Sequence, residues 1–367
     1  MRDTLLTPGE PAPWFMAASP SVPQFHFNSV AGRYVLLCFF GSAAAEPGRR
    51  VLADFTALRA RFDDETVCFF GVSTDPADRE SGRVRDELPG VRFFWDFDSA
   101  VSRQFAATGP GGECRPCTYL LDERLRVYCA LPIDPARPEA HVPFLSQVLY
   151  NLPPIPPAEP ARPQAPVLVV PRVFEPDLCR ALIDHYRRHG GQESGVMRQV
   201  GGRTVPVCDP DFKRRRDQEI QDEPLRAAAM ARVADRLVPE VHRAFQFRAT
   251  RIERHIVACY DAVAGGFFRP HRDNTTAGTA HRRFAVSLNL NTGEYAGGLL
   301  RFPEFGRQTY VAPVGGAVVF SCSLLHEATP VTAGRRFAYL PFLYDEAAAR
   351  VREQNLHAVA AGPAGRP

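Results

Sequence analysis

Apolar positions in the first half of the chain follow two patterns, continuous runs and helical spacing. Residues 34–40 and 66–72 are continuous apolar runs, which are typical of strands buried on both faces. Between them, residues 49–62 are predicted to form a helix, because apolar side chains recur there at helical spacing. The apolar positions of this helix are Val51, Leu52, Phe55, Leu58 and Phe62.

The next segments continue this alternation. A polar stretch at residues 78–87 is predicted to be helical, and the apolar residues 91–95 are predicted to form a short strand. The pattern of residues 118–128 predicts a hairpin that turns at residues 122–124. Strands that alternate with helices and end in a hairpin predict an α/β domain with a mixed sheet and helices on its faces.

The second half has a different order of elements. A strand at residues 167–171 precedes two predicted helices, at residues 175–189 and 223–245. The chain then turns to strands separated by glycine and proline, at residues 250–260, 284–291, 298–302, 309–311, 317–321 and 336–344. Helices followed by a run of strands predict an α+β double-sheet fold such as a jelly roll.

A proline-rich stretch, residues 152–166, separates the two patterns. Proline at this density forms neither helix nor central strand and favours an extended linker. We therefore predict a first domain over residues 1–151 and a second over 167–346. Residues 347–367 are rich in Ala and Gly and are predicted to form a flexible tail.

Composition narrows the functional classes. The 367 residues are 45% hydrophobic and 23% charged with a net charge of +3, which gives no reason to expect a nucleic-acid or membrane partner. No apolar run approaches the roughly 18 residues that span a bilayer, and the N-terminus lacks the apolar core of a signal peptide. Nine scattered cysteines suit reduced core thiols. We therefore expect a cytoplasmic location.

The strongest candidate chemistry lies at His271, Asp273 and His326. In an extended chain, residues i and i+2 point to one side, so His271 and Asp273 can bind the same metal ion. His326 follows several predicted strands later. Two His and one carboxylate are typical of non-haem Fe(II) oxygenases, although the ligand types alone would also suit a zinc hydrolase. No general base for hydrolysis is apparent near these residues.

Arg336 is the candidate for binding a second anionic group. It follows His326 at the start of an apolar strand, and a guanidinium beside a metal suits bidentate binding of a carboxylate. Arg335 competes for this role, and strand alternation does not decide between the two. The spacing from His326 favours Arg336.

Five segments of the second half resemble the prolyl-4-hydroxylase-type Fe(II)/2-oxoglutarate oxygenases. They are residues 260–273, 287–291, 297–303, 315–320 and 326–337, in this order. The resemblance covers about residues 167–345. It implies a double-stranded β-helix, Fe(II) at His271, Asp273 and His326, and 2-oxoglutarate on Arg336. Tyr260 and Asn289 match positions of further 2-oxoglutarate contacts.

The resemblance also implies the reaction. Fe(II), 2-oxoglutarate and O₂ would convert a substrate C–H bond into a C–OH bond, with succinate and CO₂ as co-products and ascorbate as a reductant in some members. Asp273 argues against halogenation, which needs that ligand position vacant. A prolyl or other residue of a peptide or protein is the expected substrate, and a free amino acid or natural product is the alternative.

Residues 5–150 resemble the peroxiredoxin-like thioredoxin fold, through residues 9–15, 32–40 and 118–122. A peroxidase needs a thiolate at the start of the helix after the first core strand, but residues 41–48 contain no cysteine. Cys114 and Cys117 form a CxxC that precedes a strand, so a structural role is favoured. The competing hypothesis for the chain is a thiol-redox protein with a regulatory metal-binding module.

Two further features have weaker interpretations. Residues 201–217 are predicted to form a long loop that contains a basic cluster from Lys213 to Arg216. Such a loop can act as a lid over a substrate, although a solvated charged loop is the favoured interpretation. His185 and His189 lie four residues apart on a predicted helix, where a solvated helix face is favoured over a ligand pair.

Overall fold

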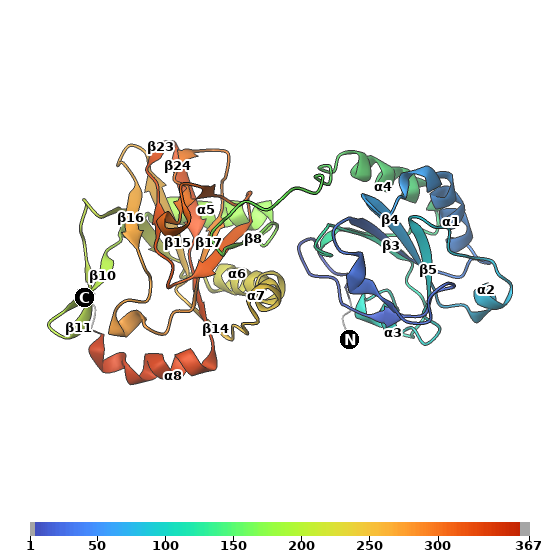
Figure 1. Cartoon of the computed structure of the whole chain (residues 1–367), viewed down its shortest axis with the longest axis horizontal. Helices are drawn as coiled ribbons and strands as arrows, with labels where there is room; N and C mark the ends of the chain where they lie inside the picture. The colour runs from blue at the N-terminus through green and yellow to red at the C-terminus, as the bar shows by residue number, and fades with distance from the viewer. Residues whose placement is uncertain (1–3, 360–367) are drawn as a thin grey trace. The chain divides into compact units, whose positions relative to one another are not determined.

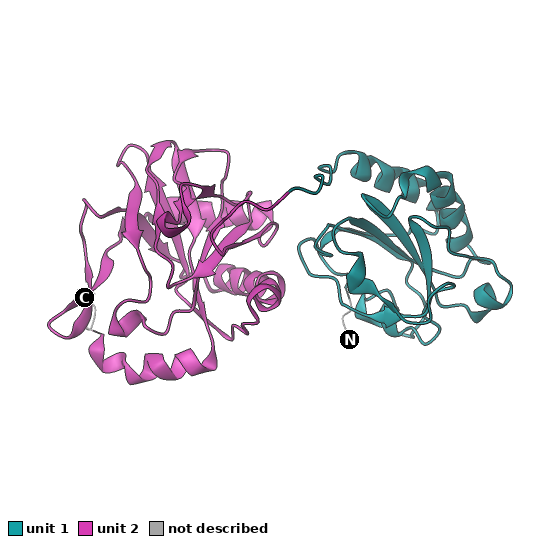
Figure 2. Cartoon of the chain, viewed as in Figure 1, with its two compact units in different colours: residues 1–159 teal, residues 160–367 magenta. Residues whose placement is uncertain are grey.

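The computed structural model describes residues 4–359 and divides into two compact units, residues 1–159 and 160–367 (Figure 2). The division falls inside the proline-rich stretch. Each unit has hydrophobic cores of its own, as expected for a separate domain.

The first unit is built on a mixed five-stranded sheet in the order β5-β4-β3-β6-β7 (Figure 1). β3, β4 and β5 run parallel, and β6 and β7 continue the sheet antiparallel. Its strands are β3 (Tyr34–Gly41), β4 (Val67–Ser73), β5 (Val91–Trp95), β6 (Cys117–Leu121) and β7 (Val127–Pro132), with a small pair of β1 (Met16–Ala17) and β2 (Phe25–His26). This is the predicted thioredoxin-like fold.

Central strand β3 is buried along its whole length because apolar side chains cover both faces of the sheet. Its alternate residues divide between two cores, one of which contains residues of the helices α1 and α4. Figure 1 shows these two helices together on one side of the sheet. The helices of the unit are α1 (Gly48–Ala57), α2 (Pro76–Glu80), α3 (Ala100–Gln104) and α4 (His141–Tyr150).

Helix α2 is shorter than predicted. The sequence suggested a helix over residues 78–87, but the observed helix ends at Glu80. Gly82 follows in a left-handed conformation with φ of +63°, which turns the chain out of the helix.

The second unit contains a large sheet and a smaller one. The large sheet runs β14-β25-β17-β24-β15-β13-β9 with β21 and β8 attached beside β17, and the smaller runs β12-β16-β22-β19-β20. The strands of the large sheet are β8 (Leu168–Val170), β9 (Gln192–Glu193), β13 (Arg216–Glu219), β14 (Arg251–Glu253), β15 (Ile256–Asp261), β17 (Phe284–Asn289), β21 (Ala317–Ser321), β24 (Arg335–Tyr339) and β25 (Phe342–Tyr344).

The remaining strands belong to the smaller sheet and to two short pairs, β10 with β11 and β18 with β23. They are β10 (Val196–Val200), β11 (Arg203–Val207), β12 (Lys213–Arg214), β16 (Phe267–His271), β18 (Ala296–Gly297), β19 (Leu300–Arg301), β20 (Thr309–Tyr310), β22 (His326–Ala328) and β23 (Val331–Ala333). The two sheets give the predicted double-stranded β-helix.

Helices cover one face of the large sheet and thereby decide which side chains point to the other face. Apolar residues of α5 (Pro176–His189), α6 (Glu223–Arg236) and α7 (Val238–Phe245) share one core with alternate residues of β15, β17 and β24. In β24 these alternate residues are Phe337 and Tyr339. The intervening residues, Arg336 and Ala338, therefore point to the opposite face of the sheet.

Three predictions for this unit were wrong in detail. The single helix expected over residues 223–245 is divided at Leu237, because Pro239 in the first turn of α7 has no backbone N–H to continue α6. The loop expected over residues 201–217 contains the strands β11, β12 and part of β13. Period-two patterns in such short strands are too weak to separate from a loop.

The third correction concerns the tail. Residues 347–367 were expected to be flexible, but α8 (Glu346–Gln354) and a 3₁₀ turn (Leu356–Ala358) extend into this region. The Asp345 side chain caps α8 by accepting a hydrogen bond from the backbone N–H of Ala348 at 2.8 Å. Ala348 is fully buried, so the helix packs on the unit. Residues 360–367 lie outside the described residues.

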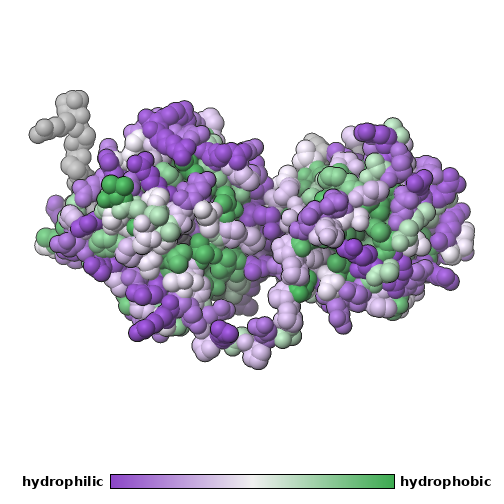
Figure 3. Space-filling view, turned by 90° about the horizontal axis from the view of Figure 1, so that it is seen from above, coloured by the Kyte–Doolittle hydropathy of each residue, from purple (hydrophilic) through white to green (hydrophobic). Residues whose placement is uncertain are grey.

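The surface of each unit is mixed in character. Hydrophilic side chains cover much of the face seen in Figure 3, and hydrophobic ones appear between them in small groups. Among residues 4–359, no helix is long and apolar enough to cross a bilayer.

Candidate metal centre

Strand pairing brings His271 and His326 together. His271 ends β16, and His326 begins the neighbouring antiparallel strand β22, where the two residues are direct register partners. Their ring centroids lie 4.2 Å apart. The fold therefore brings together two histidines that are far apart in the sequence.

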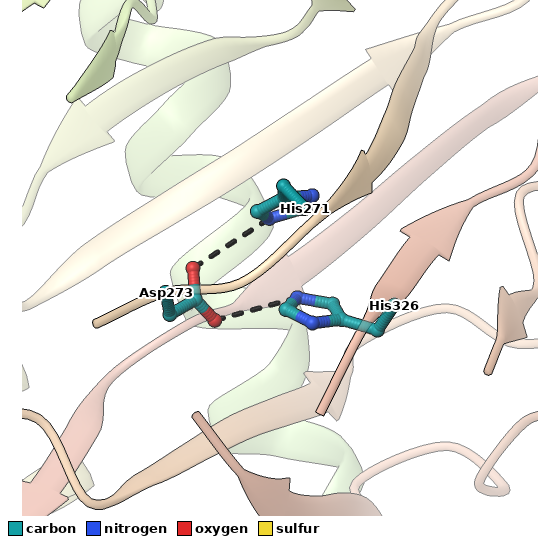
Figure 4. A group of neighbouring side chains, drawn as sticks. All are labelled: His271, Asp273 and His326. Atoms are coloured by element: carbon teal, nitrogen blue, oxygen red, sulfur yellow. Dashed lines mark ion pairs between the residues drawn. The ribbon is translucent and has the colours of Figure 1, made fainter. Parts of the chain in front are cut away.

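Asp273 completes the group from the turn after β16, and the backbone N–H of Asp273 donates a hydrogen bond to the Cys322 carbonyl at 3.0 Å. Its Oδ1 lies 3.5 Å from Nε2 of His271, and its Oδ2 lies 3.3 Å from Nε2 of His326 (Figure 4). One ligand atom from each of the three side chains lies within 4.8 Å of the others. Within the described residues, this is the one group of three or more such side chains at that spacing.

Second contacts fix which nitrogen of each ring faces the carboxylate. His271 Nδ1 lies 2.8 Å from the Arg269 carbonyl, and His326 Nδ1 lies 3.0 Å from the Leu324 carbonyl. A carbonyl only accepts hydrogen bonds, so both Nδ1 atoms carry a proton, and the neutral form of each ring has its lone pair on Nε2. Histidine ligands of metals are usually held in this way.

The charge states of the group suit a cation. Burial is the main cause that lowers the pKa of His326 to about 4, so its imidazole is neutral near pH 7. Burial alone would raise the pKa of Asp273, but the neighbouring His326 and His271 outweigh it and hold the pKa well below its usual range. Two neutral imidazoles and one carboxylate are the donor set of the facial triad that binds Fe(II). The residues present therefore fit an iron ion.

Arg336 and Tyr260 lie side by side in the wall of the pocket that contains the three candidate ligands. They are register partners of β24 and β15, and the guanidinium carbon of Arg336 lies 5.3 Å from the Tyr260 ring centroid. Both line the pocket that contains His271, Asp273 and His326. Arg335 points away and pairs with Asp261 at 2.7 Å on the surface. The structure thus places Arg336, and not Arg335, beside the candidate metal ligands.

The guanidinium of Arg336 is buried at 2% exposure and is held by neutral groups. One terminal nitrogen, Nη2, donates to the Ser287 hydroxyl at 2.7 Å and to Asn289 Oδ1 at 3.3 Å. Within the described residues its Nε has no hydrogen-bond partner. A buried cation with an unused donor fits the distal carboxylate of a ligand in the pocket. Asn289 does not line the pocket and contacts it through Arg336.

Two residues of the basic cluster in the predicted loop enter the pocket, contrary to the favoured interpretation of a solvated loop, while Arg214 and Arg216 are exposed. Lys213 and Arg215 are 5% and 6% exposed and line the pocket, with Arg254 and Arg282 from other segments. No local pattern in the sequence marks the Lys213 and Arg215 side chains as buried. Arg254 and Arg282 had no such pattern either and were missed.

Two weaker candidates lie away from the pocket. His185 is buried, contrary to the expectation of a solvated face, and its Nε2 lies 3.2 Å from the Glu219 carbonyl. In the first unit Cys117 begins strand β6, as expected for a CxxC that precedes a strand. Burial is the main cause that raises the pKa of Cys114 to about 11 and that of Cys38 to about 12. These thiols are therefore protonated near pH 7.

Comparison with known families agrees with this division of the chain. Residues 255–344 match the family model of the 2OG-Fe(II) oxygenase superfamily, and residues 8–129 match that of the AhpC/TSA family. A PKHD-type hydroxylase of Shewanella baltica is 25% identical over 183 residues, which are 48% of this chain and 77% of that protein. The second unit is thus a 2OG-Fe(II) oxygenase domain, a family defined by Fe(II), 2-oxoglutarate and O₂, and the chain is an enzyme of the oxygenase class.

Solved structures similar to parts of the chain include two of interest. A prolyl-4-hydroxylase of Pseudomonas putida is 21% identical with a TM-score of 0.39, and the match covers 49% of this chain and 94% of that one. Peroxiredoxin Q of Xanthomonas campestris is 19% identical with a TM-score of 0.31, over 37% of this chain and 89% of that one.

Proposed function

We propose that the second unit hydroxylates a C–H bond of its substrate with Fe(II), 2-oxoglutarate and O₂, and that His271, Asp273 and His326 hold the iron. The observation that carries this proposal is the convergence of two Nε2 atoms on the Asp273 carboxylate at 3.5 and 3.3 Å. Bound iron and 2-oxoglutarate supply the oxidising chemistry and release succinate and CO₂.

The side chains around the metal position would bind and orient the cosubstrate. Arg336 would pair with the distal carboxylate of 2-oxoglutarate, because it is a buried cation without a carboxylate partner among the described residues. Tyr260 would hold the Arg336 guanidinium with its ring and would offer its hydroxyl to the cosubstrate. Asn289 and Ser287 act as positioning residues for Arg336.

Water must be kept away from the reacting groups, and the surroundings of the histidines are suited to this. The Phe268 ring stacks on His271 with 3.5 Å between centroids, and the Phe320 ring lies 4.5 Å from that of His326. Apolar walls of this kind limit solvent access to a metal site.

For the substrate we propose a prolyl or other residue of a peptide or protein, with a free amino acid or natural product as the second candidate. The hydroxylase relative and the resemblance of the five sequence segments support the first. The cations of the pocket favour the second. Ascorbate as a reductant and a cytoplasmic location remain predictions. The nine unpaired cysteines are consistent with a reducing compartment.

The competing hypotheses predict different products. We would incubate the Fe(II)-loaded chain with 2-oxoglutarate, O₂ and a mixture of metabolites and proline-containing peptides, and measure succinate and products that gain one oxygen atom. Both should form with the wild-type chain and be lost in Asp273→Ala. A Zn(II)-loaded chain that hydrolyses components of the mixture, without any succinate from the Fe(II) form, would instead support a hydrolase.

A further inference from the structure

The pocket beside the proposed iron ligands is unusually rich in positive charge. Six basic residues line it, and Asp273 is the one carboxylate among its described lining residues. The six are Lys213, Arg215, Arg254, Arg272, Arg282 and Arg336. Cations crowded together in a partly buried space are costly unless opposite charges compensate them.

Carboxylates behind the pocket wall compensate three of these charges. Arg215 Nη2 pairs with Asp217 at 2.7 Å, and its Nε makes a second bond to the same carboxylate at 2.7 Å. Arg282 pairs with Glu253 at 2.7 Å. Arg272 pairs with Glu304 at 2.6 Å. These three cations are therefore neutralised within the protein itself.

Lys213 and Arg254 have no such ion pair: among the residues that the structure describes, no carboxylate oxygen lies within 4.0 Å of either, and Asp217 and Asp273 attract them only from farther away. Lys213 Nζ donates to the Ser194 hydroxyl at 2.7 Å and to the Gly195 carbonyl at 2.8 Å, which uses two of its three hydrogens. Arg254 donates through Nε and Nη2 to one acceptor, the Leu340 carbonyl. Both cations have donors left.

Packing holds both cations in place. The Lys213 ammonium lies 4.8 Å from the Phe268 ring, which in turn stacks on His271. The Arg254 guanidinium lies 4.7 Å from the Phe342 ring, and the backbone of Arg254 has the left-handed φ of +70°. That conformation is strained for arginine and persists only where the surrounding structure holds it.

Burial and a neighbouring cation both disfavour the charged forms of Lys213 and Arg254. Burial, followed by the Arg215 charge, lowers the pKa of Lys213 well below its usual range. The same two causes lower the pKa of Arg254 to about 10. An anion placed near both groups would relieve this repulsion.

Iron and 2-oxoglutarate do not supply that anion. The charge balance that follows assumes the proposed function. The two charges of Fe(II) are balanced by Asp273 and by the metal-binding carboxylate of 2-oxoglutarate, and the distal carboxylate is balanced by Arg336. Lys213 and Arg254 would still have no directly paired carboxylate after both have bound.

We infer that Lys213 and Arg254 bind a carboxylate group of the substrate and so orient the substrate beside the iron. Cations from two separate segments, β12 and the end of β14, would then fix one end of the substrate, while the C–H bond to be oxidised lies toward His271. The site would select substrates with a negative charge near the reacting carbon.

The test uses acetate as a probe and Mn(II) as an unreactive, paramagnetic substitute for iron. Mn(II) at the metal centre shortens the nuclear relaxation times of any molecule bound close by, so acetate binding can be followed in the full chain saturated with 2-oxoglutarate. Lys213→Met and Arg254→Met should each weaken acetate binding about ten-fold, the typical loss for one charge-assisted hydrogen bond. Arg214→Met and Arg251→Met are the matched controls, because both arginines are exposed, Arg214 adjoins Lys213 in β12, and Arg251 lies in β14, which ends just before Arg254.

Three results would overturn the inference. If Mn(II) still shortened the relaxation times of acetate in both variants, acetate would bind the metal or another surface. If the wild-type protein shortened the relaxation times of 2-oxoglutarate but not those of acetate, Lys213 and Arg254 would bind no carboxylate. Loss of 2-oxoglutarate binding in Lys213→Met and Arg254→Met would assign these cations to the cosubstrate. If the proposed function itself were wrong, Mn(II) and the wild-type chain would not shorten the relaxation times of 2-oxoglutarate.

Two sources of the carboxylate can be separated in the same experiment. L-Proline has a free α-carboxylate, whereas N-acetyl-glutamyl-prolinamide has only a side-chain carboxylate on a blocked peptide. Displacement of acetate by the first would indicate a free amino acid, and displacement by the second would indicate an acidic peptide.

Discussion

At the scale of single residues, the account depends on which side chains strand alternation turns into the pocket. Arg336 and Arg335 are neighbours in the sequence, yet one is buried beside Tyr260 and the other forms a surface ion pair with Asp261. Phe337 and Tyr339 decide this, because their packing on the helices leaves Arg336 on the inner face. The two arginines therefore form a natural pair for substitution.

Replacement of Arg336 by Met should raise the KM for 2-oxoglutarate about ten- to a hundred-fold, because the distal carboxylate loses a charge-assisted bidentate partner. Arg335→Met should change it by less than about two-fold, as expected for an exposed ion pair. Initial rates of succinate formation at varied 2-oxoglutarate measure both. Equal effects of the two substitutions would contradict the role of Arg336.

A second residue-scale prediction concerns His141 in the first unit. Its Nε2 lies 2.8 Å from the Thr118 hydroxyl, and burial lowers its pKa to about 4 from an ordinary value of 6.5. Between these two pH values the unfolded chain binds a proton that the folded unit does not, so the unit should lose stability as the pH falls from about 6.5 to about 4.

Both tryptophans, Trp14 and Trp95, lie in this unit, so their fluorescence during urea unfolding reports its stability in the full chain. His141→Gln cannot gain the proton and should lose less stability over the same pH range. The same decrease in both proteins would show that other groups cause it.

The residues also show what a sequence can reveal about a site. The candidate iron ligands and Arg336 follow from local spacing and from motif resemblance. The burial of Lys213 and Arg215 could not be predicted, because a basic cluster in a polar segment has the same pattern whether it is solvated or enters a pocket. Arg254 and Arg282 reach the pocket only through the tertiary fold.

At the scale of elements, the strands that carry the site depend on tight turns between them. Gly315 precedes β21 with φ of +71°, and an added Cβ would lie 2.1 Å from the Phe174 carbonyl oxygen. Its own carbonyl accepts hydrogen bonds from Val173 and Phe174, which attaches the start of the unit to the sheet. The turn therefore needs glycine both for its conformation and for space.

Gly315→Ala should destabilise the second unit by about 3 kcal/mol, from backbone strain together with the backbone contact. Gly293 has a positive φ of +99° but nothing within 4 Å of an added Cβ. Gly293→Ala should therefore cost only about 1 kcal/mol, from strain alone. Scanning calorimetry would compare them, and equal costs would contradict the importance of the Phe174 contact.

Elements with long, regular patterns were predictable, and short ones were not. The strand β3 and the helix α5 follow directly from a continuous apolar run and from helical spacing. The sequence predicts a loop where β11, β12 and the start of β13 lie, because strands of two to five residues leave little periodicity. The helix α8 was missed because its stability comes from the Asp345 cap and from packing, and its alanine-rich sequence resembles a tail.

At the scale of the whole molecule, all proposed contacts to iron, cosubstrate and substrate lie in the second unit. A fragment of residues 160–367 should therefore bind Fe(II) and 2-oxoglutarate as tightly as the full chain. The fragment of residues 1–159 should bind neither. A folded second fragment, verified by circular dichroism, that no longer binds 2-oxoglutarate would show that the first unit contributes to the site.

The first unit retains a thioredoxin-like fold without the thiol that peroxide reduction needs. Residues 41–48 contain no cysteine, and the nearby thiols of Cys38 and Cys114 have raised pKa values. We therefore expect this unit to contribute binding or structural support to the enzyme.

The most direct test of the central claim is an anaerobic titration of the full chain with Fe(II) in the presence of 2-oxoglutarate, followed by the visible absorption of the iron–keto acid chelate. The account predicts one iron per chain and an absorption band that His271→Ala and Asp273→Ala abolish. His189→Ala, an exposed histidine of the same unit, should leave the band unchanged. A band that survives the loss of His271 or Asp273, or no band in the wild-type chain, would contradict the claim.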